Sequence, residues 1–454
     1  MALGLHEKLR EKLTTDLAKI LPELRVTRGI ALTTNARVML APLDASLPGH
    51  GEIKEKLSAW ISDCPLTDFI IGSINADLMS DAYVNGEHVP LSTIKGWEDA
   101  AVKAEQLVSG FEALPRAYLV SFPAPDGIVP YLEAKDGQFR LANRVRIALA
   151  DAKFIEDHPV TTGDLQRDKS IWDTGGLMSL LNTGPHYEWK GAYLQLIVQG
   201  YLGRFIETNT EHEVIGDFKA LWGAQLALGI AQRRRTWSAY PSKRKLIVHD
   251  NHSGNIALTQ RIELDASASQ LIDDIHFHDW LPDEDNLEVK TRVYFHFLKS
   301  LDFLFGKSAE ADRLRLACRW LFDSYATDNE LLAYVQAMVC LEIILGDASL
   351  IGEIGLGELL RNRCAYLIGK TSKQRAEILR DFREIYDVRS HIVHRGKSRM
   401  TARERELYST LMWYCKRCIH EEIELLKKTK EADEEEKRAN DPVAAALLES
   451  SQKG

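Results

Sequence analysis

The sequence has few cysteines, no long hydrophobic run and no excess of positive charge, and each shortage excludes a class of protein. Six cysteines in 454 residues are too sparse for a disulfide scaffold and favour reduced thiols, which predicts a cytoplasmic protein. The N-terminus lacks the layout of a signal peptide, and no apolar run approaches the roughly 18 residues that span a bilayer, so no membrane partner is expected. A formal net charge of −9 gives no global basic field, so any site for a polyanion requires a local cluster of Lys and Arg.

Proline is absent between residue 300 and Pro442, and patterns of period 3.6 replace it. They predict helices over 312–325, 329–345, 353–368, 373–393 and 402–428. Asp328-Asn329 and Thr371-Ser372 supply N-cap residues, while Gly346, Gly369 and Gly396 stand where helices should stop. We therefore predict an all-helical bundle over residues 301–430, and a charged tail over 431–454 that is a frayed helix or disordered.

Residues 1–300 have a mixed pattern that predicts an α+β fold for the chain. An amphipathic helix is expected over 5–21 and another helix over 218–233. Short runs rich in β-branched or aromatic residues predict strands over 37–40, 69–72, 117–122, 193–198, 245–248 and 256–258. This region is expected to be a sensor or recruitment region, with two subdomains if a weak joint lies near 157–173.

The segment from Tyr386 to Gly396 carries the strongest chemical signal, because it places Arg389 five residues before His394. A guanidinium keeps its charge and can grip two phosphate oxygens, while an imidazole exchanges protons near neutral pH. RNA cleavage without metal needs both functions, since the 2′-hydroxyl must be deprotonated and charge develops on the phosphoryl oxygens. The alternative is structural: Arg389 pairs with Asp387 or Glu384, and His394 caps a helix end.

Three blocks of the predicted bundle resemble the Apea-like HEPN family, a branch of a superfamily of helical nucleases and nucleotide-binding domains. Residues 341–346 resemble the glutamate-containing end of its second helix and include Glu342. Residues 359–365 resemble its arginine-bearing third helix and include Arg361. Residues 386–394 match its closing YxxRSxIVH signature, which begins at Tyr386. The order and spacing of the three blocks carry the resemblance, which does not extend to residues 1–300.

The resemblance implies a metal-independent endoribonuclease that requires no cofactor, with Arg389 and His394 as catalytic residues and Ser390 as the polar residue after the arginine. His391 and Arg395 stand at positions regarded as variable. The resemblance also implies a homodimer formed through the bundle. Relatives with this arrangement are often bacterial anti-phage or toxin effectors, so a phage-derived or protein trigger is expected at the N-terminal region.

Helix geometry separates the two catalytic candidates. Five residues rotate the direction by roughly 500°, which leaves the two side chains about 140° apart. Either the helix unwinds before His394, or a second protomer contributes to the site, and we favour the second alternative. Arg395, Lys397 and Arg399 form a basic cluster suited to RNA backbone. Glu342 lies on an apolar helix face, which is costly unless it is paired, so we expect it to contact Arg361 or Arg389.

Three weaker patterns suggest other functions. His249, His252, His276 and His278, with Asp273 and Asp274, could supply metal ligands for a hydrolase. Cys415 and Cys418 have the CxxC spacing but lie inside a predicted helix without a second ligand pair. The basic run 233–235 is followed by Trp237, Tyr240 and the basic residues 243–245, a composition that suits single-stranded nucleic acid or a solvated helix end.

No phosphate-binding motif of the GxxxxGK[ST] type and no strand-linked GxGxxG is present, so nucleotide hydrolysis is not expected. The main alternative to a nuclease is a non-catalytic HEPN module for dimerisation or for binding RNA or nucleotides. The N-terminal region would then carry the function.

Overall fold

The computed structural model describes residues 3–27, 30–32, 35–48, 51–80, 89–160, 189–234, 244–251, 256–277, 286–346 and 355–439. The chain forms two compact units and passes between them several times. Unit 1 comprises Met1–Ala124, Lys135–Ile215 and Arg244–Leu264, and unit 2 comprises Pro125–Ala134, Gly216–Lys243 and Asp265–Gly454. The mixture of helix and strand expected from the sequence is confirmed. The bundle predicted from residue 301 falls within unit 2, together with segments that precede residue 300.

Unit 1 begins with a helical part. Its helices are α1 (Glu7–Ile20), α2 (Asn35–Asp44), α3 (Glu52–Trp60), α4 (Pro65–Ser80) and α5 (Ala100–Glu112). A small sheet of order β2-β1-β3 accompanies them, made by β1 (Arg25–Thr27), β2 (Ile30–Leu32) and β3 (Val89–Pro90). The opening helix is therefore confirmed. Its buried Leu13 and Leu17 share one core with Phe69 and Phe111, whose rings meet edge to face at 5.3 Å.

Two of the predicted strands, 37–40 and 69–72, are wrong, because both runs are helical. The first lies in α2, where buried Ala36, Leu40 and Leu43 follow a spacing of three and four residues. The second lies in α4 beside buried Ile74. A run of four apolar residues does not distinguish a buried helix turn from a strand, and only the longer burial pattern does.

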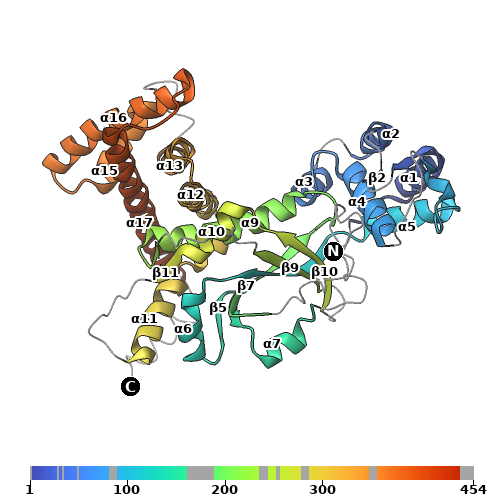
Figure 1. Ribbon diagram of the computed structural model, residues 1–454, viewed down its shortest axis with the longest axis horizontal. Coiled ribbons are helices and arrows are strands. Elements are labelled where there is room, and N and C mark those ends of the chain that lie inside the picture. Colours follow the sequence, from blue (N-terminus) through green and yellow to red (C-terminus); the bar gives the residue numbers. More distant parts are fainter. Residues whose placement is uncertain are drawn as a thin grey trace, which may run out of the picture. The chain divides into compact units, whose positions relative to one another are not determined.

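A six-stranded antiparallel sheet forms the rest of unit 1, in the order β10-β9-β4-β7-β6-β5. Its strands are β4 (Arg116–Pro123), β5 (Gln138–Ala142), β6 (Val145–Leu149), β7 (Ala192–Gly200), β9 (Lys245–Asp250) and β10 (Ala257–Glu263). The predicted strands over 117–122, 193–198, 245–248 and 256–258 are thus confirmed, the last with a start at Ala257. The hairpin of β5 and β6 was not expected. A short helix, α7 (Ala152–Asp157), follows it (Figure 1).

Several elements of unit 2 precede residue 300 in the chain. They are α6 (Val129–Glu133), α9 (Asn209–Ala227, in this unit from Gly216 on), β8 (Ala231–Arg233), α10 (Ala266–Asp274), β11 (Ile275–Phe277) and α11 (Leu287–Lys299). The helix predicted over 218–233 is therefore partly wrong: Gly229 has φ +71°, a left-handed conformation that ends the helix, and β8 then pairs with β11. A Cβ atom at Gly223 would overlap the Cys318 carbonyl oxygen, so α9 and α12 (Ala309–Ala326) lie in close contact.

The predicted C-terminal helices are all present. They are α12 (Ala309–Ala326), α13 (Glu330–Leu345), α15 (Leu356–Ile368), α16 (Ser372–Arg395) and α17 (Ala402–Ala439), shown in brown to red in Figure 1. Asn329 and Thr371 are N-caps, and Gly346, Gly369 and Gly396 follow the helix ends as expected. Helix α17 continues past the predicted end at 428 to Ala439, so the first part of the predicted tail is helical, one of the two alternatives expected for it; residues 440–454 lie outside the described residues.

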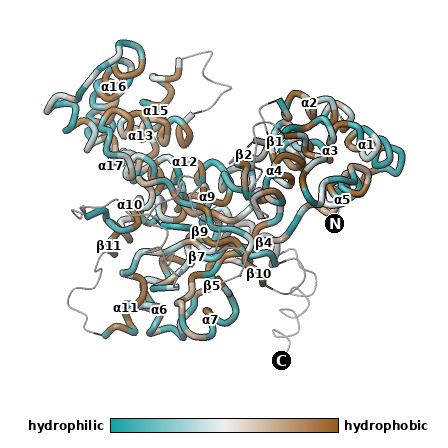
Figure 2. Tube along the Cα trace, turned by 45° about the vertical axis from the view of Figure 1, so that its right-hand side comes forward, coloured by the Kyte–Doolittle hydropathy of each residue, from teal (hydrophilic) through white to brown (hydrophobic). Residues whose placement is uncertain are grey.

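Hydropathy differs between these elements in a way that matches their burial. Figure 2 shows the central strands β4, β7 and β9 as largely hydrophobic and α16 as largely hydrophilic. Six of the eight residues of β4 are buried, whereas α16 buries Ile378, Phe382, Ile385 and Val388 along one stripe. Among the helices described for this chain, none is long and apolar enough to cross a membrane.

Candidate functional site

Helix α16 carries most of the candidate catalytic residues, and both of its ends are fixed by local interactions. At the N-terminus, the Thr371 hydroxyl accepts the Gln374 N–H at 3.2 Å while the Gln374 side chain accepts the Thr371 N–H at 3.2 Å. At the C-terminus, Gly396 takes the left-handed conformation, with φ 64°. In the middle, the Tyr334 hydroxyl of α13 donates to the Ile385 carbonyl at 3.0 Å. The helix is therefore continuous from Ser372 to Arg395 and is held against α13.

The structure brings Arg389 of α16 to Glu342 of α13. Arg389 Nη2 lies 3.3 Å from Glu342 Oε1, and the two side chains are 22% and 19% exposed. The expectation that Glu342 contacts Arg361 or Arg389 is confirmed for Arg389. The alternative pairing of Arg389 with Asp387 or Glu384 is not observed. Two of the three sequence blocks, which are 47 residues apart at these positions (389 − 342), therefore meet inside the bundle.

The Glu342–Arg389 pair leaves two buried polar atoms without a hydrogen bond to any described residue. Burial raises the pKa of the Glu342 carboxyl, and the nearby Arg389 charge opposes this rise. Glu342 Oε1 and Arg389 Nε are both shielded from solvent, and neither has a hydrogen-bond partner in the part of the chain that the structure describes. The guanidinium carbon also lies 5.9 Å from the centre of the Tyr386 ring. Arg389 is thus oriented by a carboxylate and an aromatic ring, with a hydrogen-bonding position still unused.

The supporting residues have structural contacts. Arg361 pairs with Glu358 at 3.3 Å, one turn earlier on α15. Tyr386 lies against α15, since a Cβ atom at Gly357 would come within 3.1 Å of its ring. Tyr386 therefore joins α15 to α16 directly beside the Glu342–Arg389 pair.

His394 is exposed and lies away from Arg389 on the same helix. Because α16 is regular through both residues, their directions differ by about 140°. The alternative in which the helix unwinds before His394 is therefore wrong. Ser390 is half-buried and points between the two directions, about 100° from Arg389, and His391 is exposed. One chain alone does not bring the Arg389 and His394 side chains to one face.

The three residues of the predicted basic cluster differ in their surroundings. Arg395 and Arg399 are exposed, at and beyond the end of α16. Lys397 lies 2.8 Å from Glu404 and is 23% exposed, so its charge is balanced within the bundle. Two arginines therefore remain at the surface beside His394.

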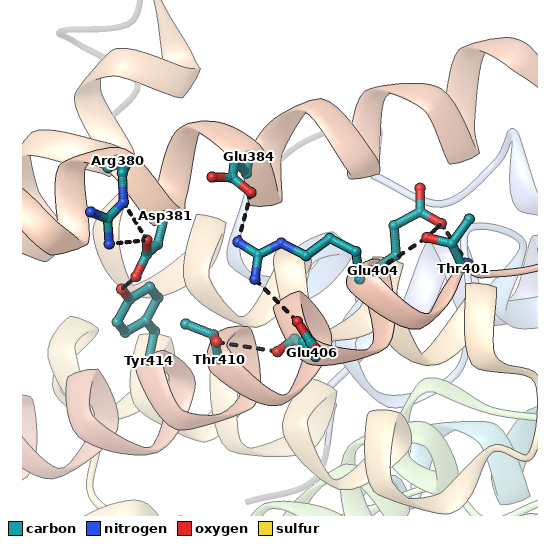
Figure 3. A network of polar contacts seen from close by, with 9 residues as sticks. Arg380, Asp381, Glu384, Thr401, Glu404, Glu406, Thr410 and Tyr414 are labelled. Carbon is teal, nitrogen blue, oxygen red and sulfur yellow. Dashed lines mark hydrogen bonds and ion pairs between the residues drawn. The ribbon is translucent and has the colours of Figure 1, made fainter.

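A polar network connects α16 to α17 and holds this end of the bundle together. Arg403 lies between Glu384 and Glu406, at 2.9 and 3.2 Å. Figure 3 labels these two carboxylates among the residues of the network. One turn before Glu384 on α16, Asp381 accepts a hydrogen bond at 3.3 Å from the Tyr414 hydroxyl of α17. Exposed ion pairs contribute little stability singly, but two links from one helix to the other restrict how α16 can rotate.

The possible metal ligands that the structure describes are not grouped into a site. His249 is buried in unit 1, with Nε2 3.0 Å from the Pro159 carbonyl oxygen, and burial lowers its pKa to about 4. His276 belongs to unit 2, while His252 and His278 lie outside the described residues. Within the ranges that the structure describes, no three His, Cys, Asp or Glu side chains are grouped so that they could hold a metal ion.

The CxxC pair faces the bundle interior. Cys415 and Cys418 are fully buried; Cys415 Sγ donates to the Ala337 carbonyl at 3.2 Å, and Cys418 Sγ lies 4.0 Å from Cys364 Sγ. The Cys364 contact, together with burial, raises the pKa of Cys418. Both cysteines are buried in the bundle core, where a free thiol packs as a small apolar group.

Arg233, the first residue of the basic and aromatic run, is used structurally. It is 11% exposed, lies 3.2 Å from Asp274 and donates to the Tyr325 carbonyl. Residues 235–243 of the run, which include Trp237 and Tyr240, lie outside the described residues.

A buried polar chain in unit 1 escaped the sequence analysis. Arg146 Nη2 lies 3.2 Å from His158 Nε2 and Arg146 Nε donates to Gln195 at 2.5 Å, and Gln195 donates to the Ser121 hydroxyl at 2.9 Å. The available signal was a polar residue within each of three apolar strands, β6, β7 and β4. Which of them meet depends on strand order, which sequence patterns do not give.

Comparison of the chain with protein-family models, with curated proteins and with solved structures gave no match. The function must therefore be inferred from the geometry of its own residues.

Proposed function

We propose that this protein is a metal-independent endoribonuclease whose site is built around Arg389 and His394 of the C-terminal bundle. The observation that carries the proposal is the contact between Glu342 and Arg389. It joins two of the three blocks that resemble the Apea-like HEPN family and orients a guanidinium at the edge of the bundle core. The proposed setting is a regulated effector of anti-phage defence or a toxin, with a trigger acting on the N-terminal region.

Each residue has one step in the proposed reaction. His394 takes the proton of a ribose 2′-hydroxyl, and the 2′-oxygen forms a bond to phosphorus as the bond to the 5′-oxygen breaks. The products are a 2′,3′-cyclic phosphate and a 5′-hydroxyl, whose oxygen takes a proton from solvent water as it leaves, while His394 returns its proton to solvent. Arg389 opposes the charge that develops on the phosphoryl oxygens, and Ser390 lies between the two on the helix surface. Arg395 and Arg399 bind flanking phosphates.

A second protomer completes this site in the proposal. The 140° between Arg389 and His394 on a continuous helix prevents one chain from aiming both at one phosphate. Val393 is one turn beyond Arg389 on the same face and is 47% exposed, so a partner helix packed there would cover an apolar side chain beside Arg389. With two-fold symmetry, Arg389 of one protomer would meet His394 of the other.

The test is cleavage of a mixed RNA pool in excess EDTA by the purified full-length protein. We expect 5′-hydroxyl ends from the wild type and from the controls Arg380→Ala, on the same helix, and His296→Ala, an exposed histidine of α11. We expect a loss of about 10²-fold or more from His394→Ala, and from Arg389→Lys, which keeps the charge but not the planar fork. Equal cleavage by all five proteins would refute the assignment. Cleavage by the wild type without EDTA but not with it would indicate a metal-dependent enzyme.

One observation favours a non-catalytic binding module as the second candidate: the Arg389 charge is already paired with Glu342 and is largely shielded from solvent. In that case the RNA pool stays intact after long incubation, yet the wild type retains RNA on a filter. Retention would then fall when Arg395 and Arg399 are both replaced by Ala, and would be unchanged by His394→Ala.

A further inference from the structure

Unit 1 contains a pocket that is distant in sequence from the HEPN-like blocks. It has a volume of about 560 Å³ and lies between α4, α5, β4, β10 and the segment that follows β7. This size is within the range of about 300–1,000 Å³ that is usual for small-molecule sites. Four aromatic side chains line it, namely Phe69, Trp97, Tyr118 and Tyr201. The rings of Phe69 and Tyr201 are in contact, with centres 5.0 Å apart.

The charged side chains that line the pocket are mostly positive. Three are cations, Lys103, Arg116 and Arg204, and one is a carboxylate, Asp77. Lys103 lies 2.9 Å from Asp77 and 4.5 Å from the centre of the Trp97 ring, so its charge is already partly balanced. The Arg116 guanidinium, by contrast, makes no ion pair or hydrogen bond within the described part of the chain. The pocket therefore offers positive charge to an anion.

The neutral polar groups that line the pocket can also form further hydrogen bonds. Burial raises the pKa of Tyr118 to about 12 and raises that of Tyr201, and the Arg116 charge opposes both shifts. Both hydroxyls therefore keep their protons at neutral pH and can donate to an anion. Gln260 is 5% exposed, and its Nε2 has no hydrogen-bond partner in the described residues. A buried amide without a partner destabilises the fold, and a hydrogen bond to a ligand would remove that cost.

We propose that this pocket binds a ribonucleoside monophosphate, with the phosphate on Arg116 and the base among the aromatic rings. A guanidinium forms two parallel hydrogen bonds to phosphate, and aromatic rings stack with any base. The Gln260 amide supplies a donor for the edge of the base or for a ribose hydroxyl. The inference rests on unit 1 alone and holds whether or not the bundle cuts RNA.

The test is isothermal titration calorimetry of the full-length protein with each of AMP, GMP, CMP and UMP, and with adenosine and inorganic phosphate. We expect saturable binding of at least one monophosphate, with adenosine and inorganic phosphate each weaker by at least about tenfold. Arg116→Gln should weaken the bound monophosphate by a similar factor. Arg140→Gln, which removes an exposed charge of β5 in the same unit, should leave the affinity unchanged.

Three results would overturn the proposal: no heat from any of the four monophosphates, equal binding of inorganic phosphate, or equal loss from Arg116→Gln and Arg140→Gln. Circular dichroism melting identifies an Arg116 variant that fails to fold. In that case Ala76→Phe provides the second variant, because it places a ring in the pocket wall contributed by α4. Unchanged binding by a folded Ala76→Phe protein would likewise refute the pocket as the site.

Discussion

At the scale of single residues, Arg389 and Glu342 hold each other in place, and this shapes what each can do. Both side chains are about four-fifths buried, and removing either partner leaves a charge that is poorly solvated. The same contact orients the guanidinium, which a phosphate-binding arginine requires. Arg389, the candidate catalytic residue, therefore also supports the fold, so the activity and the stability of each variant must be measured separately.

The pH dependence of stability tests this pairing. Burial raises the folded-state pKa of Glu342 above its ordinary value of 4.5, so between these two values the folded state binds more protons than the unfolded state. This group therefore lowers the free energy of unfolding as pH rises through that window. Arg389→Met removes the charge that limits the shift, which widens the window.

We expect urea unfolding to show that Arg389→Met costs about 1–3 kcal/mol at pH 7.5 and clearly less at pH 5, where the carboxyl can take up a proton. Glu342→Gln in the Arg389→Met background should restore part of the loss at pH 7.5. A cost that is the same at both pH values, with no rescue, would show that the pair has no electrostatic role.

At the scale of elements, α16 positions the candidate site because it stays regular up to Arg395. Its buried stripe, its N-terminal capping box and the Tyr334 hydrogen bond all fix its direction. Beyond Arg395 the chain must turn towards α17, and Gly396 makes that turn with φ 64°.

Replacement of Gly396 measures the contribution of this turn. No atom lies within 4 Å of the position where a Cβ atom would be, so the cost comes from the backbone alone. We expect Gly396→Ala to lower the free energy of unfolding by about 1 kcal/mol, and Gly396→Asn by clearly less, because Asn tolerates the left-handed conformation. Denaturant unfolding of the two variants checks this. Equal costs would mean that strain in the turn is not the cause.

At the scale of the whole molecule, the proposed site requires two chains, and mixing two inactive variants tests this. In a heterodimer of Arg389→Lys and His394→Ala, one composite site carries both changes and the other carries neither. Random reassociation should then restore about a quarter of wild-type cleavage, since half the dimers are mixed and each has one intact site. Recovery should be measured after mild denaturation and refolding of the mixture.

Two controls make the complementation result decisive. Each variant refolded alone should stay inactive, and the refolded wild type should recover its activity. If the mixture recovers none while the wild type does, Arg389 and His394 act within one chain or are not catalytic.

Local sequence patterns predicted the C-terminal helices well, because each one combines a capping residue, a long period-3.6 stripe and a terminal glycine. Asn329, Thr371 and Gly396 all mark ends where the structure has them. The sequence also limited the partner of Glu342 to Arg361 or Arg389, because a carboxylate on an apolar face requires a cation nearby, and the packing of α16 against α13 selected Arg389. Short apolar runs failed as guides, and the segment 69–72 became a helix because the buried positions around it extend from Pro65 to Ile74, about three helical turns.

The interior of the six-stranded sheet and the division into two units depend on contacts between segments far apart in the chain. The His158–Arg146–Gln195–Ser121 chain and the pocket around Arg116 exist because strand order brings these residues together, and strand order is set by the packing of the whole unit. Local periodicity records which side of an element is buried, while the partner that buries it is selected by the free energy of the complete fold. The helical bundle and its candidate residues could therefore be predicted from the sequence, whereas the pocket of unit 1 is formed only by the tertiary packing of distant segments.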